Sequence, residues 1–302
     1  MSLVDASMLT AAIFFAIYGL ACSVECGIAL SFLAGRQKQT RKYFTPLWEV
    51  TNVFLVFGFT TVAMLFNNAL SALSHALLST LVVGLFALLI RACVALVLFY
   101  WRPDHLPKRG ASIFALTCFA IPLSFTAAGV YLLTGQLFWQ TLVGWMLMLS
   151  ALLGIVAIGQ LAINDQSDPR KLLSNELLFA AWLLFLGSFL PLSILYSGSY
   201  LQKWPVAAIG LLSILGLLVA YLVTTGRTKF KLKYYAGLIG LATPLLLALA
   251  NRPYLVQGKI KLADGFGAAS YAGAFLLGSV IIFPLVVLGF WLFIKLMNRP
   301  SN

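Results

Sequence analysis

Long uncharged apolar runs are the feature that most constrains how this chain can fold. The 302-residue sequence is 62% hydrophobic and only 9% charged, whereas a soluble domain has about 25% charged residues. A hydrocarbon core about 30 Å thick is crossed by about 20 apolar helical residues, because every backbone polar group must be satisfied inside the membrane. The sequence therefore predicts an all-α integral membrane protein.

Nine segments are long and apolar enough to cross the membrane. The connections are short and rich in Pro, Gly, Asn and charge, as in YWRPDHLPKRG at residues 100–110. We expect no cleaved signal peptide, and one polytopic domain over residues 1–302, made of two four-helix bundles plus one additional helix. The expected helices cover residues 8–34, 46–66, 73–99, 111–133, 138–163, 177–196, 205–225, 235–250 and 268–297.

The distribution of Lys and Arg predicts the orientation. Of the twenty, fifteen fall on one side of the expected topology, Arg91 lies within a helix, and four fall on the other side: Lys203, Arg252, Lys259 and Lys261. Positive charge marks cytoplasmic loops, so the N-terminus is expected outside and the C-terminus in the cytoplasm. The net charge of +12 is thus assigned to topology, and no nucleic-acid partner is expected.

Three charged residues lie well inside the expected helices: Glu25, Glu49 and Arg91. A charge at the bilayer centre costs about 2.5–3.5 kcal/mol on insertion scales, which makes each a candidate functional residue. At 1.5 Å per residue, Glu25 is about 13 Å, Arg91 about 12 Å and Glu49 about 5 Å from the expected cytoplasmic ends of their helices. We therefore expect an ion pair or a water-bridged pair between Glu25 and Arg91, with Glu49 between that pair and the cytoplasm.

This arrangement resembles a proton entry path, and a simpler interpretation stays open. The pair could only lock helix packing, and Glu49 could be an ordinary solvated acid. Trp48, beside Glu49, is of a residue type common at membrane interfaces. The four cysteines lie in apolar stretches and are expected to be buried apolar side chains.

No catalytic motif is present, so we do not expect the chain to be an enzyme on its own. Its two histidines, His75 and His105, are expected at opposite surfaces and cannot clamp one haem between them. A secondary transporter is an alternative, because Pro122 and Pro284 could break two helices. A membrane anchor for a soluble dehydrogenase or reductase is a third, weaker alternative.

One stretch, PLWEVTNVFLVFGFTTVAMLFNNALSALSHALLSTLVVGLFALLIRA at residues 46–92, resembles subunit II of cytochrome bd-type quinol oxidases. Trp48 and Glu49 fall on the Trp-Asp pair of that family, and Arg91 falls on its Arg. In SVECGIALSFLAGR, Glu25 falls on a family Asp and Gly27 is kept. The last outer loop and helix are also similar, over residues 261–296. Glu replaces both family Asp residues and Val50-Thr51 replaces Gly-Asn, which indicates a divergent member.

The resemblance implies the non-haem subunit of a terminal oxidase that reduces dioxygen to water with quinol. It implies a heterodimer with pseudo-twofold symmetry, in which subunit I carries b- and d-type haems. It also implies contacts with lipids, a structural quinone in some members, a small accessory subunit in some complexes, and the cytoplasmic membrane of a bacterium or archaeon. Carried over to this sequence, it implies a proton pathway of Glu49, Glu25, Arg91 and Trp48, and no haem or metal bound by this chain alone.

Overall fold

A computed structural model describes residues 2–34, 37–97, 108–163, 232–267 and 269–297, with a few isolated positions between 180 and 215. Within these residues the chain is mostly helical. Four described helices are long and apolar enough to cross a membrane. The elements are α1 (Leu3–Leu33), α2 (Gln37–Leu65), η1 (Asn67–Ala69), α3 (Leu70–Leu96), α4 (Lys108–Thr134), η3 (Phe138–Gln140), α5 (Leu142–Ile163), α8 (Leu232–Ala250), β1 (Tyr254–Val256), β2 (Ile260–Lys261), α9 (Leu262–Gly265) and α10 (Ala272–Met297).

The predicted helices at 8–34, 46–66, 73–99, 111–133, 138–163, 235–250 and 268–297 each have a helical counterpart. The predicted helices at 177–196 and 205–225 lie outside the described residues. The count of nine, the two four-helix bundles, the single domain and the orientation of the termini therefore stay predictions.

Several predicted bounds are wrong, because apolar runs show only the part of a helix that meets lipid. α1 begins at Leu3, where Ser2 and Asp5 form a reciprocal capping box that satisfies free backbone donors. α2 begins at Gln37, nine residues before the predicted start, in a polar stretch that hydropathy does not mark. The connection at 251–267, which is expected on the outer side, contains a two-stranded antiparallel hairpin, so the fold is not purely helical.

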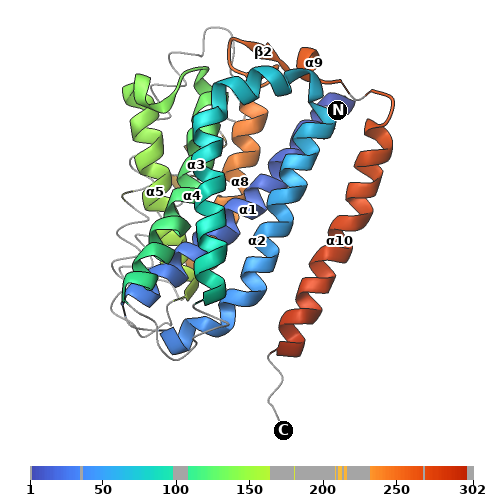
Figure 1. The fold of residues 1–302 in the computed structure, drawn as a ribbon. Helices are drawn as coiled ribbons and strands as arrows, with labels where there is room; N and C mark the ends of the chain where they lie inside the picture. Colours follow the sequence, from blue (N-terminus) through green and yellow to red (C-terminus); the bar gives the residue numbers. More distant parts are fainter. Residues whose placement is uncertain are drawn as a thin grey trace.

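Helix α1 runs obliquely through the middle of the bundle (Figure 1). It contacts α2, α4, α5, α8 and α10. Of an apolar 18-residue stretch of α1, 61% of the residues are buried inside the protein. The corresponding value for the segment Asn67–Leu96, which includes α3, is 22%. α1 is thus the central helix of the described part, while α3 packs mainly on α4 and keeps an apolar face exposed.

Two glycines allow α1 and α5 to cross at very close range. A Cβ atom at Gly27 would collide with the backbone of Gly159, and a Cβ at Gly159 would collide with the carbonyl of Ser23. Small residues let the backbones of membrane helices approach in this way. The crossing fixes the height of α1 just where Glu25 lies.

An aromatic cluster joins α10 to α1 and α2. Phe14 stacks on Phe57 with ring centroids 5.4 Å apart. Phe283 of α10 lies 6.4 Å from Phe14 and 6.0 Å from Phe54 by the same measure. Among the long described helices, α10 packs mainly on α1 and α2. Figure 1 shows it at the edge of the bundle.

The start of α1 is tied to the connection after α8. Arg252 Nη2 donates to Asp5 Oδ2 over 2.6 Å. This contact puts the beginning of α1 and the hairpin at the same end of the bundle, opposite the end of α10 (Figure 1). The charge pattern also predicts that these two parts share one side of the membrane.

The helix crossing generates a first prediction. Gly27→Ala should destabilise the protein by about 1–3 kcal/mol, because the added methyl group overpacks a backbone contact. Gly19→Ala on the same helix is the matched control, since a Cβ there has open space around it. The control should be neutral or stabilise by up to about 1 kcal/mol through helix propensity. Thermal unfolding of the purified protein in detergent measures both, and equal shifts would contradict the crossing.

Candidate functional site

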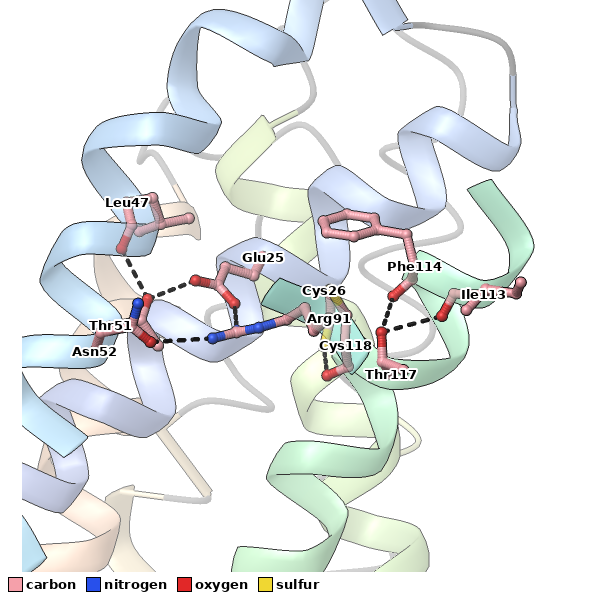
Figure 2. Close-up of polar contacts among 10 residues, drawn as sticks. All are labelled: Glu25, Cys26, Leu47, Thr51, Asn52, Arg91, Ile113, Phe114, Thr117 and Cys118. Atoms are coloured by element: carbon pink, nitrogen blue, oxygen red, sulfur yellow. Dashed lines mark hydrogen bonds and ion pairs between the residues drawn. The ribbon is translucent and has the colours of Figure 1, made fainter. Parts of the chain in front are cut away.

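A buried ion pair joins α1 to α3. Glu25 and Arg91 are each only 1% exposed, and Arg91 Nη1 donates to Glu25 Oε2. Figure 2 shows the two side chains pointing toward each other between the helices. The contact predicted from their similar depth is thereby confirmed.

Two polar side chains of α2 complete the hydrogen bonds of the pair. The Thr51 hydroxyl lies 2.7 Å from Glu25 Oε1, and Arg91 Nη2 donates to Asn52 Oδ1 over 3.3 Å. Each carboxylate oxygen of Glu25 therefore has a partner from a different helix (Figure 2). Arg91 Nε is buried without a hydrogen-bond partner among the described residues.

Physical chemistry explains why so many partners gather here. Transfer of two charges from water into a low-dielectric interior costs several kcal/mol per ion, and good geometry with additional hydrogen bonds is needed to offset it. Three helices supply those bonds through four side chains: Glu25, Thr51, Asn52 and Arg91. The polar cluster they form is called the Glu25–Arg91 cluster below.

Apolar and weakly polar side chains enclose this cluster. Cys22, Cys26 and Cys118 are buried, and the Cys26 thiol donates to the carbonyl of Cys118 over 3.0 Å. Phe32 and Phe114 pack beyond them, with ring centroids 5.8 Å apart. The prediction that all four cysteines are buried is wrong for Cys93, which is exposed on α3. In a membrane, an exposed helix face meets lipid, which an apolar thiol tolerates.

The other two predicted site residues lie on α2, within the turn that precedes Thr51. Trp48 is half-buried and packs against the apolar cluster around Cys26 and Phe114. The backbone of Glu49 belongs to α2, while its side chain lies outside the described residues. Glu49 is twelve residues from the start of α2 at Gln37.

Thr51 and Asn52 are members of the cluster that sequence reasoning missed. Thr51 is buried and contacts Glu25 of α1. Asn52 is partly buried and contacts Arg91 of α3. A signal was available, because two hydrogen-bonding side chains open an otherwise apolar run. The contact itself could not be found without knowing which face of α2 meets α1 and α3.

The described residues contain no group of three or more His, Cys, Asp or Glu side chains able to hold a metal ion. His75 is exposed near the start of α3, and His105 lies outside the described part of the chain. The Glu25–Arg91 cluster instead offers a buried carboxylate that is held by a cation and a hydroxyl. Such a group can accept and release a proton where water is scarce.

Comparison with known families identifies the chain. The family model for cytochrome bd terminal oxidase subunit II matches residues 4–297, nearly the whole sequence. The chain belongs to this family. A comparison with curated proteins finds no match.

Membership of the cytochrome bd subunit II family makes the chain a multi-pass membrane protein and a component of a terminal oxidase in electron transport. It implies a partnership with subunit I in an oxidase complex, where the haems generally reside in subunit I. The resemblance seen in the sequence is thus confirmed for the family.

A second prediction concerns the ion pair. Glu25→Gln and Arg91→Met should each destabilise this subunit by about 3–5 kcal/mol, because each leaves one buried charge or donor without its partner. The double variant should lose less than the sum of the two single losses. Thermal unfolding of the purified complex measures all three. Strictly additive losses would argue against an energetic contact between the two side chains.

The Asp5–Arg252 pair provides the control. Arg252 is 32% exposed on its side chain, so water screens its charge. Arg252→Met should cost only about 1 kcal/mol, because the exposed guanidinium is screened and the buried Asp5 carboxylate still accepts from the Ser2 backbone N–H.

Proposed function

We propose that this chain is the non-haem subunit of an oxidase that reduces dioxygen to water with quinol. In this role it supports the haem-bearing subunit I in a heterodimer and contributes part of a cytoplasmic proton-entry path. The observation that carries the proposal is the buried cluster in which Glu25 is bonded to both Arg91 and Thr51. The family match over residues 4–297 supports the oxidase setting.

The proposed path has one acid at the membrane surface and one inside. Glu49 is the entry acid, because at about 5 Å from the expected cytoplasmic end of the apolar stretch it is the nearer of the two acids to the cytoplasm. Glu25 is the inner relay, Arg91 is its cationic partner, and Trp48 packs beside the entry. Oxygen reduction consumes protons, so uptake from the cytoplasm with release of quinol protons outside separates charge across the membrane.

Glu25 suits a relay because its environment is balanced. Burial in an apolar core penalises the charged carboxylate, while Arg91 and the Thr51 hydroxyl favour it. A group held between these opposing effects is of the kind that occurs at functional sites. Arg91 also keeps a bond to Asn52, so its charge retains a partner when Glu25 is neutral.

Further parts of the proposal concern ligands and location. A cavity of about 240 Å³ between α1, α2 and α10 offers apolar space for the tail of a structural quinone, and its lining includes Phe14, Phe54, Phe57, Phe275 and Phe283. An additional small subunit, and the cytoplasmic membrane of a bacterium or archaeon as location, complete the proposed setting.

A third prediction tests the entry acid. Glu49→Gln should slow oxygen consumption by about a hundredfold, because a positioned proton-transfer group contributes at least about that factor. The haem absorption spectrum should be unchanged, since subunit I holds the haems. Asp264→Asn is the matched control, as it neutralises an exposed acid in α9 at the other end of the bundle (Figure 1). Unchanged turnover in Glu49→Gln would remove the entry-acid role.

A fourth prediction tests the assembly. Gentle detergent purification of this chain should yield a second, haem-bearing chain in fixed proportion, seen by optical spectrum and gel. The expected preparation is coloured and consumes oxygen when quinol is added. A colourless single chain would instead favour the transporter alternative.

A further inference from the structure

Thr51 has two hydrogen-bond acceptors within reach and only one proton to donate. Its Oγ1 lies 2.7 Å from Glu25 Oε1 and 2.8 Å from the carbonyl oxygen of Leu47. A hydroxyl group carries one donor hydrogen and two acceptor lone pairs. The single hydrogen of Thr51 cannot point straight at both oxygens, so at most one of the two contacts is a linear donated bond at a time.

The protonation state of Glu25 decides which bond Thr51 donates. When Glu25 is ionised, its Oε1 has no hydrogen, so Thr51 donates to Glu25. When Glu25 is protonated on Oε1, the acid donates to Thr51 Oγ1, and Thr51 turns its own hydrogen to the carbonyl of Leu47. In both states every hydrogen in this set has an acceptor, and the heavy atoms keep their places.

We propose that Thr51 is a hydroxyl switch that lets Glu25 change its protonation state without leaving an unpaired buried group. The only covalent bond that forms or breaks is the O–H bond of Glu25, and Thr51 keeps its own proton throughout. The use of this switch during turnover rests on the proton path proposed above. In that path Thr51 is a positioning residue that acts through Glu25.

The surroundings of the switch favour this role. Thr51 is 0% exposed and Glu25 is 1% exposed, so bulk water cannot replace the missing partner. The Leu47 carbonyl suits the second state, because Thr51 lies four residues later on the same helix, the usual spacing of such a side-chain bond. The carbonyl also has two lone pairs, so it accepts the hydroxyl in addition to its helical N–H.

Other ionisable groups around Glu25 in the described chain have different chemistry. They are Tyr18, Cys22 and Cys26 on α1, Arg91 on α3 and Cys118 on α4. Only Arg91 and Thr51 form a hydrogen bond with the Glu25 carboxylate there. Arg91 has only donors, so it cannot accept the proton of neutral Glu25. Thr51 is therefore the one described partner that serves both states.

The fifth prediction uses infrared difference spectroscopy on the purified oxidase complex while the pH is varied. The Glu25 carboxyl band is the one lost in Glu25→Gln. In Thr51→Val this band should move to higher frequency, because the neutral acid loses the acceptor of its O–H. Thr51→Ser keeps the hydroxyl and should leave the band at the wild-type position.

Thr61→Val is the matched control. Thr61 lies on the same helix, is 0% exposed, and donates to the carbonyl of Phe57 over 2.6 Å, with no acid among its hydrogen-bond partners in the described structure. Its replacement removes an equivalent buried hydroxyl and should leave the Glu25 band unchanged. A Thr51→Val band at the wild-type frequency would overturn the switch, as would a Glu25 that stays ionised at every pH.

Oxygen consumption by the same variants separates the switch from the proton path. If both proposals hold, Thr51→Val should slow turnover by about tenfold and change its pH profile, while Thr51→Ser recovers it to within about twofold. A shifted Glu25 band with turnover and pH profile unchanged would support the switch and overturn the path through Glu25.

Discussion

The ion pair between Glu25 and Arg91 joins α1 to α3 through two residues that are 66 positions apart in sequence. A buried charge is tolerated only when its partner and their remaining hydrogen bonds are in place. The pair therefore restricts how α1 and α3 lie against each other, and Thr51 and Asn52 extend that restriction to α2. Any change in the relative height of these three helices would leave a charge without compensation.

The packing around the cluster holds the three helices at the required heights. Gly27 lies two residues after Glu25, and its contact with Gly159 brings the backbones of α1 and α5 together. The apolar cluster of Cys26, Phe32 and Phe114 closes the space toward α4. Polar and apolar contacts thus restrain the middle of α1 in the same position. The Glu25–Arg91 cluster therefore has a fixed geometry in an otherwise apolar bundle.

A fixed geometry matters because proton transfer in a membrane cannot depend on bulk water. A relay acid needs partners for both its charged and its neutral form, and it needs them at the same atomic positions. Arg91 can serve the charged form of Glu25, while a hydroxyl such as that of Thr51 can serve either form. Thr51 is thus chemically suited to the site it occupies.

The sequence by itself determined the helical membrane class, most helix positions, the family, and the pairing of Glu25 with Arg91. Hydropathy and the energetic cost of isolated buried charges are local properties that can be counted along the chain. Helix ends such as Gln37, the hairpin at 254–261, the exposure of Cys93 and the contacts of Thr51 and Asn52 were decided only by tertiary structure. The rotation of a helix about its axis selects which side chains meet, and in an almost uniformly apolar helix no sequence periodicity records that rotation.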